Sequence, residues 1–420
     1  MFYSTTDVYA TKRETIHFAK NLVTGAKQVE SKFITQSIYG ILKSGSIILK
    51  NIAVALNESI KLKNTIDRLS QNLQRPFSQS ITDRYTGKMV TALGEKPIIL
   101  VDDSDVIKPH GHAFEALGEV RDGSSRDKRI EKGYSVTEIV GLTARQKQPV
   151  SLFSQIHSSW EQKYKSTNEV LFDGLRYVIG QLKKKATFVF DRGYDMNALF
   201  KFMHKNEQYY IVRLTEKRKI FWKGKWFKST VLRDSRKGKI KATLTFKEDG
   251  KVKKKTVYVS HLNVQITASR KPIRLVLVYG LGEVPMMLAT NRILENKEDV
   301  IRIIRDYMSR WRVEEYFRFK KQHFGFEDFR VRSLMSINQL NQLLTYAIGL
   351  LGLLADKSET SQLFHRLIHN ARALRRDIQF HYYQLAEGIV STLAHARTGI
   401  GGWIPIRKSG PRQLEMKLAC

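Results

Sequence analysis

Residues 97–105 read PIILVDDSD, an apolar run that breaks into three acidic residues. A run that is apolar on both faces is typical of a central strand buried between helices. The stretch ATFVFDRGYD, residues 186–195, has the same form and reaches its first acid at Asp191. The neighbouring elements are expected to be strands at 134–143 and 149–158 and a helix at 167–185. Three strands, a helix and a fourth strand in this order predict an α/β core.

The charge of the chain points to a polyanionic partner. Its 420 residues are more than one typical domain needs, and 72 Lys and Arg against 40 Asp and Glu give a formal net charge of +32. Self-repulsion of this size is relieved by binding nucleic acid. An anionic lipid surface or a ribosomal assembly is the alternative, and a ribosomal protein rarely needs so long a chain. We therefore expect double-stranded DNA as the partner and no membrane association.

Cysteine usage and hydropathy favour a cytoplasmic protein. Cys420 is the only cysteine, which excludes an intramolecular disulfide and a thiolate metal cluster. The first residues contain no basic segment followed by an apolar run, so no secretory signal is expected. Residues 343–355 are apolar but too few to span a bilayer, and they predict a buried helix.

Residues 1–75 are expected to be helical. Apolar residues recur at helical spacing at Ile48, Ile52 and Leu56 and again at Leu62, Ile66 and Leu69. Two helices joined by a tight turn follow from this pattern. They could form a DNA-binding helix-turn-helix in which Lys61, Lys63 and Arg68 contact phosphates, or a helical hairpin that packs on the core. The sequence favours neither reading over the other.

Residues 206–295 have the alternating, β-branched texture of a β-rich insertion. Residues 201–260 contain 19 Lys and Arg against 5 Asp and Glu, and Trp222 and Trp226 lie inside this basic field. Cations that follow phosphates and aromatic rings that stack on bases are typical of a DNA-binding surface. The other interpretation of the two tryptophans is a hairpin in which they pack on each other.

The segment YMSRWRVEEYFRFKK, residues 307–321, carries the densest mixture of charge and aromatics. Residues 298–321 lack Gly and Pro and follow Asn296, so one helix with an Asn296 N-cap is expected. At about 100° per residue, one polar face of this helix carries Tyr307, Arg310, Glu314 and Lys321. The apolar stripe beside that face is expected to be Ile304, Met308, Trp311 and Phe319.

Three carboxylates from separate elements could meet at one site. Two strands end in acids, at Asp102 or Asp103 and at Asp191, and the helix adds Glu314. Mg²⁺ prefers oxygen ligands and needs few carboxylates when substrate phosphate is present. Two such ions can support an in-line displacement at phosphorus. His110 and His112 lie in a loop without further ligands, so no metal site is expected there.

With these motifs in place, the sequence resembles the DDE transposases of bacterial insertion sequences, in the insertion-sequence-four group. The signature of that group is Tyr, Arg, Glu and Lys at the spacing of Tyr307, Arg310, Glu314 and Lys321. DRGYD at 191–195 is similar to the second-acid motif, and VDDSD at 101–105 to the first. The resemblance extends over most of the chain.

The resemblance implies an RNase H-like catalytic core with a β-rich insertion and an N-terminal helical domain. The expected domains are a DNA-end-binding domain at 1–75, the first core part at 76–205, the insertion at 206–295, the second core part with the catalytic helix at 296–375, and a helical basic region at 376–420. The resemblance also implies cut-and-paste transposition in a bacterial cytoplasm by a homodimer on paired DNA ends. Such enzymes bind terminal inverted repeats, nick the DNA, form and reopen hairpin ends, and join the 3′ hydroxyls to target DNA.

By position, the resemblance implies that Asp102, Asp191 and Glu314 ligate two Mg²⁺ or Mn²⁺ ions, and that Tyr307, Arg310 and Lys321 bind DNA at the cleavage site. The choice among Asp102, Asp103 and Asp105 stays open on alternation alone, although the Asp-x-Ser pattern favours Asp102. Relatives place a tryptophan before the catalytic helix to stabilise a flipped base. In this sequence the matching stretch contains Met286 and Met287 and no tryptophan. A nuclease with the same core and a DNA-binding regulator derived from a transposase are the rival functions.

Overall fold

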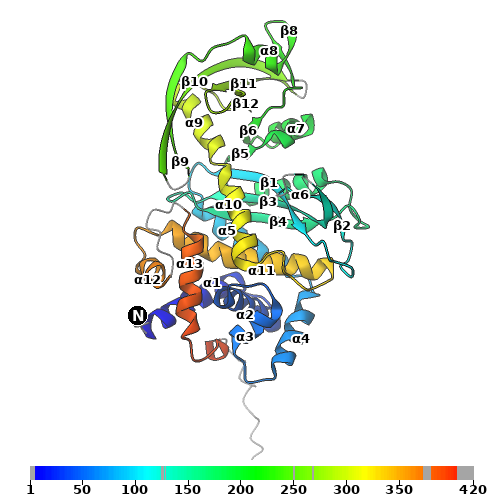
Figure 1. The fold of residues 1–420 in the computed structure, drawn as a ribbon, viewed down its shortest axis with the longest axis vertical. Coiled ribbons are helices and arrows are strands. Elements are labelled where there is room, and N and C mark those ends of the chain that lie inside the picture. Colours follow the sequence, from blue (N-terminus) through cyan, green and yellow to red (C-terminus); the bar gives the residue numbers. More distant parts are fainter. Residues whose placement is uncertain are drawn as a thin grey trace, which may run out of the picture.

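A computed structural model of the protein describes residues 5–123, 127, 129–248, 251–266, 269–371 and 380–403. Along its longest axis the molecule has three tiers: a β-rich tier, a central α/β tier and a tier of helices (Figure 1). Residues 404–420, which include Cys420 and the end of the predicted 376–420 region, lie outside the described residues.

The central tier is built on a mixed sheet whose inner strands match the expected apolar runs. Its strands are β1 (Ile98–Ile107), β2 (Gly118–Arg121), β3 (Ile130–Leu142), β4 (Pro149–His157), β5 (Thr187–Phe190) and β6 (Tyr209–Arg213). The order across the tier is β4-β3-β1-β5-β6, and β2 pairs with the start of β3. Strands β1, β3 and β4 pair antiparallel, whereas β5 and β6 run parallel to β1. The four predicted strands and the α/β class are confirmed.

Helices cover this sheet because its strands are apolar on both faces. Helices α5 (Gln79–Ala92) and α6 (Thr167–Gln181) pack on β4, and α6 also reaches β3. Helix α11 (Leu334–Asp356) packs on β4 as well and contains the predicted helix 343–355. Nearly all of that stretch is buried in α11, so the prediction of a buried helix is confirmed.

The β-rich tier continues the same sheet. Its elements are β7 (Lys219–Trp222), β8 (Lys225–Lys228), α8 (Ser229–Asp234), β9 (Ile240–Glu248), β10 (Lys251–Ile266), β11 (Ser269–Tyr279) and β12 (Met286–Thr290). Strand β12 pairs antiparallel with β6, and β11, β10 and β7 follow outward. Strand β6, within the range expected for the insertion, therefore joins the two tiers by pairing with β5 on one side and β12 on the other.

The helical tier brings together the first and the last helices of the described chain. Its helices are α1 (Thr5–Leu22), α2 (Gln28–Ser44), α3 (Leu49–Leu56), α4 (Leu62–Leu73), α11, α12 (Gln362–Asn370) and α13 (Tyr382–Ala394). The expected helix pair is confirmed as α3 and α4. Helix α2 packs on α11 and α13, and Lys12 donates a 2.6 Å hydrogen bond to the carbonyl of Thr398. The N-terminal helices are thus part of one helical layer with the C-terminal ones (Figure 1).

The expected single helix over 298–321 is wrong. The segment forms α9 (Lys297–Met308) and α10 (Trp311–Phe324), with a turn at Ser309 and Arg310. The Ser309 hydroxyl donates to the carbonyl of Asp306 at 2.6 Å, and the Arg310 amide bonds to Tyr307 three residues back. These bonds, each to a residue three positions back, interrupt the α-helical pattern at the turn. Asn296 caps α9 as expected, because its side chain accepts from the Asp299 amide.

The break also changes the apolar stripe. Ile304 and Phe319 are fully buried as expected, but Trp311 is 40% exposed, so its assignment to the buried stripe is wrong. Trp311 is the first residue of α10, directly after the turn, and the guanidinium of Arg312 lies 4.6 Å from its ring centroid.

Within the described residues, no single helix is long and apolar enough to cross a membrane. The bent pair Gln28–Ser44 and Leu49–Leu56 passes that test only when its two helices are counted together, across a 98° bend.

Candidate active site

Two of the predicted acids lie side by side because of the strand register. Strands β1 and β5 are parallel neighbours, and Val101 pairs with Phe190. The next residue on each strand is an acid, Asp102 on β1 and Asp191 after β5. Parallel neighbours are about 4.8 Å apart, so both acids lie at the same place along the sheet, just past the carboxyl end of β5.

Alternation along β1 sends Asp102 and Asp103 to different partners. Asp103 accepts hydrogen bonds from Thr137 at 2.7 Å and from Tyr194 at 2.8 Å. The Thr137 hydroxyl is also 3.1 Å from Nε2 of the buried His157. Asp102 instead accepts a 2.9 Å bond from Arg310. The structure therefore places Asp102, rather than Asp103, against the α9–α10 segment.

The turn between α9 and α10 brings the signature residues to these acids. The Arg310 guanidinium bonds to Asp102 at 2.9 Å and to Glu314 at 2.5 Å. The Tyr307 hydroxyl donates to Asp191 at 3.2 Å. All three predicted carboxylates thus contact a side chain of the signature, and Arg310 links two of them directly.

The environment of Asp102 disfavours its charged form. Burial raises the pKa of Asp102 to about 7, the charge of Arg310 opposes that rise, and Asp103 and Glu314 add to it. A cation at this position would therefore stabilise the ionised carboxylate.

Carboxylate oxygens are suitable ligands for a hard divalent cation, but their arrangement here is closed by Arg310. In the described part of the chain, no group of three or more His, Cys, Asp or Glu side chains is placed to hold a metal ion. The guanidinium of Arg310 instead bonds to one oxygen of Asp102 and one of Glu314. The oxygen donors suit Mg²⁺ or Mn²⁺, but the three carboxylates are not positioned to hold such an ion together.

Lys321 reaches a different set of acids. Its ammonium lies 3.5 Å from Asp105 and 3.2 Å from Glu327. Glu327 also accepts from the Ile107 amide at 3.0 Å and so ties the segment after α10 to the end of β1. Sequence analysis did not single out Glu327, because it lies in a loop without periodicity.

A fully buried ion pair fixes α10 on the sheet. Lys320 donates to Glu138 at 2.9 Å, and both side chains are 0% exposed. Glu138 is also bonded by the hydroxyls of Ser151 and Ser154. A buried charge pair needs such additional hydrogen bonds to offset its loss of hydration. In the sequence, the sign of this pair is Glu138, an acid inside the otherwise apolar strand YSVTEIVGLT; no role was predicted for it.

In the motif DRGYD at 191–195, the last residue, Asp195, fixes the conformation of the turn through its contacts. Asp195 is 1% exposed, pairs with Arg218 at 2.6 Å, and accepts from both the amide and the hydroxyl of Thr215. Asp195 thus anchors the turn that follows Asp191 and does not face the three acids.

The predicted DNA-binding residues outside the centre are distributed over two tiers. Lys61 and Lys63 are exposed at the start of α4, whereas Arg68 pairs with Glu58 at 2.6 Å and bonds to Gln36. Arg68 is therefore already engaged within the helical tier.

The two tryptophans lie on the β7–β8 hairpin, whose turn residues Lys223 and Gly224 both have positive φ, as a two-residue turn requires. Trp222 packs on Phe227 and Trp226 on Phe221, so the interpretation that the tryptophans pack on each other is wrong. Cross-strand pairing places Phe221 opposite Trp226, which sets the second of these contacts.

Comparison with known proteins gives one family match. Residues 167–350 match the family model described as a transposase DDE domain, a range that contains Asp191 and Glu314. This match supports a transposase of the DDE type. Among curated proteins no match was found.

Among solved structures, the chain is similar to a piggyBac transposase synaptic complex with hairpin DNA, determined by cryo-electron microscopy. The two are 9% identical with a TM-score of 0.44, over 99% of this chain and 88% of the other.

Proposed function

We propose that the protein is a DDE transposase of the insertion-sequence-four type that carries out cut-and-paste DNA transposition. The observation that carries the proposal is the meeting of Asp102, Asp191 and Glu314 around Tyr307 and Arg310. The family match over residues 167–350 agrees with it. The order β4-β3-β1-β5-β6, with three antiparallel strands followed by two parallel ones, supports an RNase H-like core.

In this proposal Asp102, Asp191 and Glu314 hold one or two Mg²⁺ or Mn²⁺ ions. Divalent cations at such a site activate the attacking oxygen and stabilise the charge that develops on the phosphate. Arg310 must release Asp102 and Glu314 for this to happen, and a DNA phosphate is a suitable new partner for its guanidinium. Tyr307 holds Asp191 in place through its hydroxyl.

The cleavage step balances as a hydrolysis. A water oxygen forms a bond to phosphorus, the bond from phosphorus to the 3′ oxygen breaks, and a proton ends on that oxygen. The freed 3′ hydroxyl is the nucleophile for hairpin formation and, after reopening, for joining to target DNA. The terminal inverted repeats, the paired-end homodimer and a bacterial cytoplasmic location are parts of the same proposal.

The test is cleavage of a labelled duplex that carries the DNA flanking the gene. We expect nicked and hairpin products with Mg²⁺ or Mn²⁺ and none with a chelator. Glu314→Gln, Asp102→Asn and Asp191→Asn should each lower the rate by about 10³-fold or more while DNA binding persists. Glu298→Gln is the matched control, because Glu298 is exposed and pairs only with Arg305 among the described residues. Binding without cleavage by the unaltered protein would favour a DNA-binding regulator, and cleavage without end joining would favour a nuclease.

A further inference from the structure

Asp103 is an acid of the first motif to which the proposed reaction gives no role. It follows Asp102 in β1, and alternation along the strand sends the two side chains to opposite faces of the sheet. Asp103 is exposed to solvent, yet both of its oxygens accept hydrogen bonds, one from Thr137 at 2.7 Å and the other from Tyr194 at 2.8 Å. Both donors are buried, with 0% and 7% exposure. A buried hydroxyl needs an acceptor, and Asp103 provides one for each of them.

Tyr194 carries this contact to the second acid. It ends the short 3-10 helix η1 (Arg192–Tyr194) that directly follows Asp191, and its amide donates to the Asp191 carbonyl at 3.1 Å. Its ring packs on Phe190, the residue before Asp191, with the ring centroids 5.6 Å apart. The position of Tyr194 is therefore tied to that of Asp191 through the backbone and through the neighbouring ring.

Asp103 is tied to the first acid as well. Its amide donates to Oδ1 of Asp102 at 3.1 Å, whereas Arg310 bonds to Oδ2 of the same carboxylate at 2.9 Å. The bond that Arg310 must release in the proposed reaction and the bond that Asp103 makes thus use different oxygens. Through Asp103 and Tyr194, a continuous path of hydrogen bonds joins the two acids without passing through Arg310.

The path is anchored in the interior of the sheet. Thr137 lies opposite Asp103 on β3, and its hydroxyl is 3.1 Å from Nε2 of His157 on β4. The Thr137 hydroxyl has one proton, which it donates to the carboxylate, so Nε2 of His157 is the donor in the second contact. His157 is buried, and its ring stacks on Tyr164 at 5.8 Å between centroids. Because β4, β3, β1 and β5 are neighbours in this order, the bonds cross the sheet to the turn after β5.

Asp102 and Asp191 need a restraint of this kind once Arg310 leaves. The two carboxylates lie side by side at the ends of neighbouring strands, and like charges repel. In the structure, the guanidinium of Arg310 offsets part of this repulsion at Asp102. In the proposed reaction that guanidinium turns to a DNA phosphate, and until another cation takes its place the repulsion acts to separate the acids.

We propose that Asp103 is a positioning residue, which holds Asp102 and Asp191 at a fixed separation. It acts through its bond to Tyr194 and is itself held by Thr137. The inference rests on the proposed function, because that function requires the two acids to work together. A displacement of about 1 Å at a reacting centre costs on the order of 100-fold in rate, so loss of the restraint should be visible in the chemical step.

The first experiment separates DNA binding from the chemical step. Tyr194→Phe removes only the hydroxyl that bonds to Asp103. Its single-turnover cleavage rate at saturating DNA should fall by about 10-fold to 100-fold, while the Kd for DNA stays within about twofold. Tyr210→Phe is the matched control, because the Tyr210 ring is also buried and its hydroxyl lies 3.0 Å from Nε2 of His204 on the other side of β5. The control should keep both values.

The second experiment asks whether these residues act through one path. Asp103→Ala should lower the rate at least as much as Tyr194→Phe. The double variant should be no slower than Asp103→Ala alone, because both substitutions remove the same bond. Thr137→Val has the shape of threonine without the hydroxyl and should also slow cleavage, whereas Thr137→Ser keeps the hydroxyl and should recover most of the rate.

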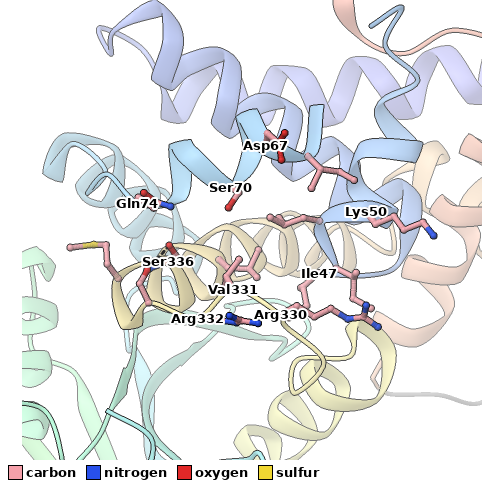
Figure 2. Close-up of a pocket in the computed structure, with 15 residues that line it drawn as sticks. Ile47, Lys50, Asp67, Ser70, Gln74, Arg330, Val331, Arg332 and Ser336 are labelled. Atoms are coloured by element: carbon pink, nitrogen blue, oxygen red, sulfur yellow. Dashed lines mark hydrogen bonds between the residues drawn. The ribbon is translucent and has the colours of Figure 1, made fainter. Parts of the chain in front are cut away.

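Asp67 supplies the control for the loss of a carboxylate. It lies on α4 at a groove of about 810 Å³ between α4 and the start of α11, where Arg330 and Arg332 line the opposite wall (Figure 2). The groove lining is largely apolar and includes none of the three acids of the proposed active site. Asp67 is exposed, so Asp67→Ala removes the same charge as Asp103→Ala and should leave the cleavage rate unchanged.

A third measurement does not depend on activity. Amide hydrogen exchange in residues 191–195 should be faster in Tyr194→Phe than in the unaltered protein, on the order of tenfold, because the turn has lost its bond to β1. Tyr210→Phe should leave the exchange of this segment unchanged. A general loss of stability would instead raise exchange across the whole sheet.

The outcomes separate this inference from the proposed function. Cleavage by the unaltered protein with an unchanged rate in Tyr194→Phe, or a double variant whose losses multiply, overturns the positioning role and leaves the transposase function standing. An unaltered protein that does not cleave DNA overturns both. A lower rate at unchanged DNA affinity, together with faster exchange confined to 191–195, supports the positioning role of Asp103.

Discussion

Asp102 and Glu138 are direct cross-strand partners on β1 and β3, so their side chains project from the same face of the sheet. Each is bonded to a cation from the α9–α10 segment, Asp102 to Arg310 and Glu138 to Lys320. The first pair is partly exposed, whereas the second is fully buried. The same arrangement thus supplies one contact that solvent can reach and one that is sealed inside the protein and holds the helix in place.

Removing Arg310 should open the carboxylates to metal. In Arg310→Ala we expect Mn²⁺ to bind the DNA-free protein about tenfold more tightly, equivalent to about 1.4 kcal/mol, because the competing guanidinium is gone. Cleavage should nevertheless fall, since a phosphate contact is lost. Titration calorimetry with Mn²⁺ measures the first effect, with Arg305→Ala as the control for an exposed surface pair. Equal or weaker Mn²⁺ binding by Arg310→Ala would show that the guanidinium does not compete with the metal.

Breaking the buried pair should destabilise the fold. Lys320→Met leaves the Glu138 carboxylate buried without its counter-charge and should lower the free energy of unfolding by about 3–5 kcal/mol. Adding Glu138→Gln should recover part of that loss, because an amide is far less costly to bury than a charge. Urea unfolding of the single and double variants measures the coupling free energy between Lys320 and Glu138. Arg305→Ala, which breaks an exposed pair, should cost no more than about 1 kcal/mol. A similar small cost for Lys320→Met would contradict the structural role.

His157 should make part of the stability depend on pH. Burial lowers the pKa of His157 to about 4, whereas an unfolded histidine titrates near 6.5. As the pH falls from about 6.5 towards 4, the unfolded chain takes up the proton first, so the stability of the native state declines. His157→Gln cannot titrate and should reduce this decline by up to about 3 kcal/mol.

Urea midpoints at pH 7.5 and 5 test the comparison between His157→Gln and the unaltered protein. His110→Gln is the control, because His110 is exposed. Identical pH dependence in His157→Gln and the unaltered chain would mean that this imidazole does not stay neutral when buried.

Trp226 should contribute to DNA binding more than to folding. It is 53% exposed on the β7–β8 hairpin, so Trp226→Ala should change stability by less than about 0.5 kcal/mol. If a base stacks on its ring, affinity for single-stranded or hairpin DNA should fall by about 1–3 kcal/mol. Fluorescence anisotropy with hairpin DNA checks this, and Trp160→Ala is the control, because Trp160 is also exposed but lies in the turn after β4. An equal effect of both substitutions would remove Trp226 from the DNA-binding surface.

The sequence by itself determined the inner strands and the acids that follow them. The runs IILV and TFVF are apolar on both faces, so they had to become inner strands, and the acids after them had to emerge at strand ends. Spacing also placed Tyr307, Arg310 and Glu314 within reach of one another. These are local properties, which hydrophobic periodicity and residue type encode directly.

Tertiary structure decided which of these side chains meet. Alternation could not choose between Asp102 and Asp103, and only the packing of Arg310 on one of them distinguishes their environments. The turn at Ser309, the burial of Lys320 on Glu138 and the groove between α4 and Arg332 join residues far apart in the chain. Such contacts depend on how whole elements pack, because the energy of a buried charge or an open cation is set by neighbours that no local pattern specifies.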